Sequence, residues 1–181
     1  MIVVTPKLSV VKRAVSRYLF VSLLITSAVS CSAKNPNYDT ALSRWQGVVQ
    51  EFAQESSLVT HAKRYSDERA NLDTRQINLL DIKWRSAEED NGFATANTSA
   101  EVSGLILTFQ QSYPQFVEIF ATDKVGLNIG QSNLTTDFYQ ADEQWWQDSY
   151  HLGGKSYFGQ IEYDESGKHW VIPFYTPIKD E

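Results

Sequence analysis

Aromatic side chains are concentrated in the last quarter of the sequence. Between residues 138 and 175 they include Trp145, Trp146, Tyr157, Tyr163 and Tyr175. Tyrosine and tryptophan combine a large apolar ring with one hydrogen-bonding group, which suits a pocket for a small molecule. Such rings also fill the core of a small sheet, and composition leaves both interpretations open. Because Trp145 and Trp146 are adjacent, they cannot both point into a core, so we expect one to pack and the other to line a cavity.

The residue types that usually perform catalysis form no recognisable constellation. His61, His151 and His169 are far apart and show none of the spacings of metal ligands. The adjacent carboxylates Asp142 and Glu143 lack the alternating oxygen ligands of a calcium loop, and a solvated acidic face explains them. We therefore expect no catalytic residue, no metal and no cofactor. A hydrolase that uses Asp142 and Glu143 is the enzymatic alternative.

The composition indicates one globular domain with an acidic body. The chain has 181 residues, 42% of them hydrophobic, a single cysteine and a formal charge of −6. Residues 1–30 contain four basic residues and no acidic one, so the remainder has 12 basic and 22 acidic residues and a charge of −10. A body of that charge is repelled by nucleic acid, which we exclude as a partner. One cysteine excludes a disulfide framework.

The first thirty residues have the layout of a signal peptide. A basic stretch precedes a mostly apolar run over 18–29, which is shorter than the roughly 20 residues that a transmembrane helix needs. The segment ends Ala28-Val29-Ser30-Cys31, which resembles the bacterial lipoprotein signal, although Ala28 stands where leucine is usual. The resemblance implies cleavage before Cys31 and its lipidation. The alternative is an ordinary signal peptide with an incidental cysteine.

The same resemblance predicts where the protein resides. Ser32 and Ala33 follow the cysteine without the aspartate that marks inner-membrane retention in lipoproteins. This implies a bacterial cell-envelope protein anchored in the outer membrane through Cys31 and facing the periplasm. We divide the chain into a signal peptide (1–30), a small polar tether (31–39) and a folded domain (40–181).

Hydrophobic periodicity in that domain predicts helices first and an antiparallel sheet afterwards, which is the α+β class. Apolar spacings predict one long helix from 39 or 40 to about 64, which would also suit pairing between two copies of the chain. We expect short helical turns and loop over 65–95. A capping box at Thr98–Glu101 begins a helix that Pro114 ends. The later elements are strands at 116–122, 127–130, 157–163 and 168–176 and a helix at 142–150.

The order of motifs in the second half resembles a Cache domain, the PAS-like sensor module of bacterial extracytoplasmic signalling proteins. The motifs that carry the resemblance are residues 116–123, Gly126, residues 142–147, Gly154, residues 157–159, 163–167 and 172–180. The resemblance implies a ligand pocket around Trp145, Trp146 and the inward positions of the following strands, notably Tyr157. It also implies a long helix at the N-terminal side of the domain.

Two departures from the family change what the resemblance implies. Amino-acid-binding members place an arginine two residues before this tryptophan, whereas this sequence has Glu143. A carboxylate there repels a carboxylate ligand and favours an amine or a neutral molecule. Family members also continue past the final Pro-x-x-Asp motif with one more strand, which these residues do not include. We therefore expect an unpaired edge near the middle of the sheet, or a strand that a partner supplies.

Together these features predict a lipid-anchored envelope domain that binds a small molecule for sensing or capture and is not an enzyme. Its ligand-binding residues would be Glu143, Trp145, Trp146, Tyr157, Tyr163 and Tyr175. An envelope receptor, or a second copy bound through the 40–64 helix, would be its protein partner. The alternative is a structural or interaction lipoprotein that retains the fold without a ligand.

Overall fold

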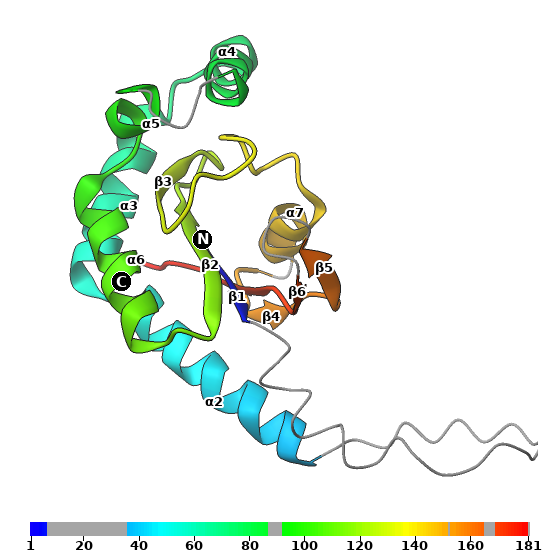
Figure 1. The fold of residues 1–181 in the computed structure, drawn as a ribbon. Coiled ribbons are helices and arrows are strands. Elements are labelled where there is room, and N and C mark those ends of the chain that lie inside the picture. The colour runs from blue at the N-terminus through cyan, green and yellow to red at the C-terminus, as the bar shows by residue number, and fades with distance from the viewer. Residues whose placement is uncertain (7–35, 87–91, 152, 165–168, 181) are drawn as a thin grey trace, which may run out of the picture.

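The computed structural model describes residues 1–6, 36–86, 92–151, 153–164 and 169–180. These residues form six helices, a five-stranded antiparallel sheet and a separate two-stranded hairpin, so the predicted α+β class is confirmed. Figure 1 shows the sheet at the centre, with α2, α3 and α6 along one side and α7 on the other.

After β1, five helices in the described ranges follow one another, and the later strands are interrupted by α7. The helices are α2 (Pro36–Ala53), α3 (Ser56–Arg69), α4 (Thr74–Arg85), α5 (Gly92–Asn97), α6 (Ala100–Ser112) and α7 (Gln144–His151). The strands are β1 (Ile2–Pro6), β2 (Phe116–Thr122), β3 (Asn128–Gln131), β4 (Tyr157–Phe158), β5 (Glu162–Asp164), β6 (His169–Val171) and β7 (Phe174–Thr176). The five-stranded sheet has the order β3-β2-β1-β7-β4, and the hairpin consists of β5 and β6.

The middle strand of the sheet is the N-terminal segment β1. It runs antiparallel to both neighbours, with Val3 opposite Phe120 of β2 and Tyr175 of β7. This is the place where the sequence analysis expected an unpaired edge. Ile2 and Val4 are fully buried, and burying such a side chain contributes about 1.5–3 kcal/mol. Residues 1–6 therefore belong to the folded domain, which the sequence analysis began at residue 40.

This placement bears on the predicted signal peptide. Residues 2–6, which the sequence analysis assigned to the leader, are an integral strand in the uncleaved chain. Residues 7–35, including the apolar run, Cys31 and most of the tether, lie outside the described residues. The leader and its cleavage thus stay predictions. Cleavage before Cys31 would remove the middle strand from the sheet.

One face of the sheet packs against α2, α3 and α6. The main core forms between these helices and the inward residues of β1, β2, β3 and β7. The helices contribute Val49 and Phe52 of α2, Leu58 of α3 and Ile106 of α6. The single helix predicted from 39 or 40 to 64 is not confirmed, because residues 36–69 form two helices. Glu55 separates them: its carboxylate accepts a hydrogen bond from the Leu58 backbone and begins α3.

Each of the two long C-terminal strands that the sequence predicts is divided in the structure. The 157–163 strand becomes β4 and β5, and the 168–176 strand becomes β6 and β7. Pro173 has no N–H to donate to a ladder, and its carbonyl accepts from the Gly159 N–H where the divided strands cross. Tyr157 and Tyr163, which one continuous 157–163 strand would place on the same face, therefore lie in different sheets.

The 65–95 segment, expected to be mostly loop, contains the full helix α4. Asp73 and Gln76 form a reciprocal capping box at its start, and Trp84 is buried beneath it against Phe138. The start of α6 also differs by one residue from the prediction. Ser99, not Thr98, is the N-cap, and its hydroxyl accepts from the Val102 N–H.

Candidate functional site

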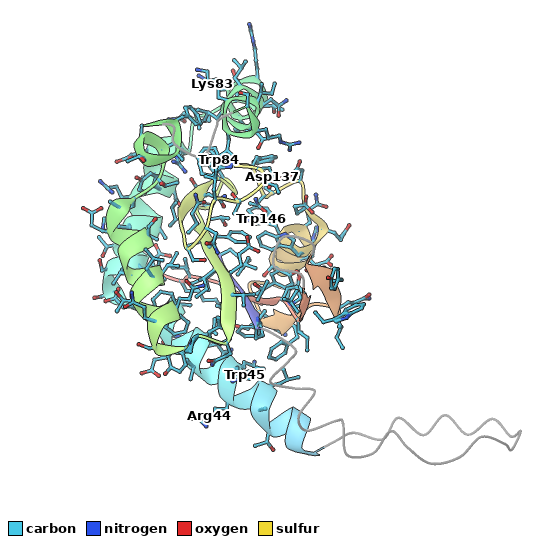
Figure 2. The ribbon with its side chains drawn as sticks, in the orientation of Figure 1. Arg44, Trp45, Lys83, Trp84, Asp137 and Trp146 are labelled. Atoms are coloured by element: carbon cyan, nitrogen blue, oxygen red, sulfur yellow. The ribbon has the colours of Figure 1, made fainter. Side chains whose placement is uncertain are left out.

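The two adjacent tryptophans of α7 lie in different environments, as expected from their sequence. Trp145 packs on the sheet: its ring is stacked on Tyr175 at a centroid distance of 5.0 Å and meets Phe120 edge-on at 5.9 Å. Trp146 lines a cavity together with Thr122 at the end of β2. Figure 2 labels Trp146 at α7.

The sheet-facing side of α7 is filled by aromatic rings. Tyr157 lies 4.9 Å from Tyr175 by ring centroids, and its hydroxyl donates to the Trp145 carbonyl oxygen at 2.6 Å. Val3 of β1 and Phe120 of β2 complete this aromatic cluster. Burial raises the pKa of Tyr157 to about 12 and raises that of Tyr175 further, so both phenols are neutral at physiological pH. Three predicted ligand residues, Trp145, Tyr157 and Tyr175, thus contact one another.

The cavity lies beside this cluster and has a volume of about 560 Å³. That is within the range of small-molecule sites, which runs from about 300 to 1,000 Å³. Its wall comes from five parts of the chain: α3, the β2–β3 turn, α7 with the following glycines, residues 177–180, and Met1 of the N-terminal segment. Sequence reasoning predicted one of these wall residues, Trp146, and missed the others.

Charged groups of both signs line the cavity. The cations are Lys63, Lys124 and Lys179, and the anions are Asp67, Asp123 and Asp180. Two of these anions are engaged: Asp180 forms an exposed ion pair with Lys63 at 3.4 Å, and Asp123 pairs with Arg69 at 2.8 Å. A ligand that carries one net charge would meet groups of its own sign in this wall. A neutral polar molecule or a zwitterion can match both signs.

Asp123 is a fixed part of this wall. One of its carboxylate oxygens accepts hydrogen bonds from the backbone N–H groups of Val125, Gly126 and Leu127 at 2.9–3.0 Å, and the other accepts from Arg69. Gly126 has φ +94°, and a Cβ on it would collide with Ala141. The turn after β2 is therefore rigid. The segment from Thr122 to Gly126, which the sequence analysis did not assign to a site, positions three wall residues.

The hydroxyl of Thr122 is the unusual polar group of the wall. Thr122 is fully buried, and its Oγ1 has no hydrogen-bond partner among the described residues. An unmet buried hydroxyl costs about 1–3 kcal/mol. A polar ligand atom that reaches this part of the wall would remove that cost.

Two further predicted ligand residues do not line the cavity, and the predicted lipidation site falls outside the described residues. Glu143 is exposed and does not line the cavity; partial burial, Asp137 and Asp142 raise its pKa. The charge argument that used Glu143 to select a ligand therefore does not apply to this cavity. Tyr163 stands exposed on the β5–β6 hairpin, edge-on to Trp170 at 5.4 Å. Cys31 is not described.

One serine, one histidine and one glutamate do meet, but not as a catalytic triad. Ser99 Oγ lies 3.5 Å from His61 Nδ1, yet it donates to Glu101 at 2.9 Å and accepts from the Val102 N–H. This is the bonding of a helix cap, in which the histidine takes no proton from the serine. Within the described ranges, no three His, Cys, Asp or Glu side chains are placed to hold a metal ion.

Comparison with protein-family models, curated proteins and solved structures gives no match for this chain. The Cache resemblance consequently rests on the sequence motifs alone. None of the helices in the described ranges combines the length and hydrophobicity needed to cross a bilayer.

Proposed function

We propose that this protein is a non-catalytic binding domain that holds a small polar molecule in the cavity between α3, α7 and residues 177–180. The observation that carries the proposal is the cavity itself: about 560 Å³, with one indole, three lysines and three aspartates in its wall. In such sites, polar groups that converge beside an aromatic ring fix the orientation of the ligand.

The balance of charge in the wall favours a zwitterion or a neutral polar molecule over a carboxylate. Asp123 pairs with Arg69 and Asp180 lies beside Lys63, and the wall also carries Asp67, Lys124 and Lys179, so both signs of charge are present on different elements. A molecule with an amine and an acidic group can contact both. Trp146 provides apolar area, and a cation over its ring adds about 0.5–2 kcal/mol.

We further propose that the domain is held at the bacterial cell envelope through a lipidated Cys31 and serves there in sensing or capture. The basic and apolar leader, the small residues before the cysteine and the absence of any other cysteine support this. Labelling with radioactive palmitate tests it: the wild-type chain should incorporate label and Cys31→Ala should not. Equal incorporation by both chains would overturn the anchor.

A thermal-shift screen of the full chain against amines, amino acids, neutral polar molecules and carboxylates tests the binding function. We expect the largest increases in melting temperature from zwitterions or neutral polar molecules. Lys179→Gln should reduce the increase. Lys83→Gln on α4 is the matched control and should not, because Lys83 does not line the cavity and lies away from Trp146 in Figure 2. No increase with any class would contradict the proposal.

The second candidate is a structural lipoprotein, and the filled aromatic cluster favours it. Trp145, Tyr157 and Tyr175 contact one another at part of the position where the Cache resemblance implies a ligand. An envelope-interaction protein would show no shift in the screen above and yet would be recovered with a protein partner by crosslinking in cells.

A further inference from the structure

The middle strand β1 is unlike the other strands in how the chain reaches it. β2 and β3 are joined by a tight turn, whereas 29 residues separate Pro6 at the end of β1 from Pro36 at the start of α2. β1 also has a neighbour on both sides, so it fills a gap between β2 and β7.

The gap between β2 and β7 contacts both faces and both edges of β1. Ile2 and Val4 point into the main core, and Val3 points into the aromatic cluster on the other face. Register pairs run from Ile2 to Pro6 along β2 and from Ile2 to Val4 along β7. In addition, the Thr5 hydroxyl donates to the Glu118 carbonyl oxygen at 3.2 Å. The side chains accommodated are branched and apolar, with one hydroxyl near the end.

The gap also holds the N-terminal end of the strand. The Met1 amino group donates to the Thr122 carbonyl oxygen at 2.9 Å, and the Met1 carbonyl accepts from the Thr122 N–H at 2.8 Å. Met1 reaches the wall of the cavity. Capture of a terminal amine by backbone groups next to a paired strand is a known mode of peptide recognition.

We propose that the gap between β2 and β7 is a strand-binding site, filled in this chain by residues 1–6. It accepts in trans an extended peptide with a free N-terminus and branched apolar side chains on both faces. The site is distinct from the cavity for small molecules and goes beyond the proposed binding function. The proposed lipid anchor requires cleavage before Cys31. In that mature domain residues 1–6 would be absent and the gap between β2 and β7 would be unfilled.

Strand exchange in the full chain tests this proposal. A protease site is introduced between residues 7 and 35 in a Cys31→Ala background, and the folded chain is then cut. We expect residues 1–6 to remain with the domain through gel filtration. A peptide of residues 1–7, labelled on Lys7, should replace them and bind saturably. Failure of the labelled peptide to bind would overturn the proposal.

Two peptide variants test how the gap recognises its strand. Val4→Asp places a carboxylate in the main core and should weaken binding at least 100-fold, whereas the matched control Thr5→Ser keeps the hydroxyl and should change it less than about 5-fold. Equal binding by Val4→Asp and the wild-type peptide would overturn specific insertion. If the cut domain unfolds when its strand leaves, the added wild-type peptide should restore its helical circular dichroism, and no restoration would equally overturn the site.

Discussion

The two sides of α7 differ in what they do with the same residue type. On one side Trp145 is stacked on Tyr175 and meets Phe120 edge-on, and the rings pack against the sheet. On the other side Trp146 borders a cavity of about 560 Å³ whose wall is charged. Aromatic residues in a sequence therefore do not by themselves mark a pocket. What distinguishes the wall of a binding cavity from a packed core is the charge of the surrounding side chains and the space left between the elements.

The largest change in stability should come from removing a ring from the packed aromatic cluster. Tyr175→Ala removes a ring that contacts Trp145 and Tyr157, and it should lower the free energy of unfolding by about 3–5 kcal/mol. Urea denaturation measures this change. Tyr175→Phe keeps the ring and is the matched control, with a loss below about 1 kcal/mol. A similar small loss for Tyr175→Ala would mean that this side is not a packed core.

The next largest change in stability concerns the N-terminal segment, in which Met1 reaches the cavity and Val3 of β1 packs in the aromatic cluster. Burial lowers the pKa of the Met1 amino group from 8.0 to about 5, while Asp123 opposes this shift. The other charged groups of the cavity wall are Lys63, Asp67, Lys124, Lys179 and Asp180. In the unfolded chain the amine binds a proton below pH 8, and in the folded chain only below about 5. Stability should therefore fall by about 2 kcal/mol as pH decreases from 8 to 6.

Urea denaturation at pH 6, 7 and 8 measures this dependence, and an N-terminally acetylated chain is the control. Acetylation removes the titrating amine, so the acetylated chain should lose much less stability over this range. Identical pH profiles for the two chains would show that the amine is not buried between Thr122 and the cavity. Glu143 and Asp137, whose pKa values are raised, act in the opposite direction and at lower pH.

At the cavity wall we expect a substitution to increase the free energy of unfolding, by a smaller amount than the changes above. Thr122→Val replaces the unpartnered buried hydroxyl with a methyl group of similar size, so it should raise the free energy of unfolding by about 1 kcal/mol. Thr135→Val is the contrasting control, because the Thr135 hydroxyl bonds with Asn128 and the Asp137 carbonyl and its loss should destabilise. Destabilisation by Thr122→Val would show that its hydroxyl has a partner and is not reserved for a ligand.

The sequence predicts the elements whose signals are local. The β2 strand at 116–122 coincides with its prediction, and α7 and β3 differ from theirs by a few residues. Periodicity could not place β1, because a run such as Ile-Val-Val-Thr becomes a strand only when a distant gap accepts it. It also missed the division of the C-terminal strands, which depends on a contact between Gly159 and Pro173.

The candidate site was harder to predict than the fold, for a related reason. Trp146 was found because adjacent tryptophans must diverge on a helix. Lys63, Asp67 and Lys179 were not, because they are ordinary charged residues until folding brings α3 and residues 177–180 to one cavity. The Asp73–Gln76 capping box was readable in the sequence and would have indicated α4.

The central claim is that the Trp146 side of α7 binds a small molecule, and paired calorimetric titrations test it most directly. The strongest compound from the thermal-shift screen is titrated into the wild-type chain, Trp146→Ala and Tyr163→Ala. We predict at least tenfold weaker binding for Trp146→Ala and unchanged binding for Tyr163→Ala, whose ring lies on the exposed hairpin. Equal affinity for wild type and Trp146→Ala, or a loss confined to Tyr163→Ala, would contradict the claim.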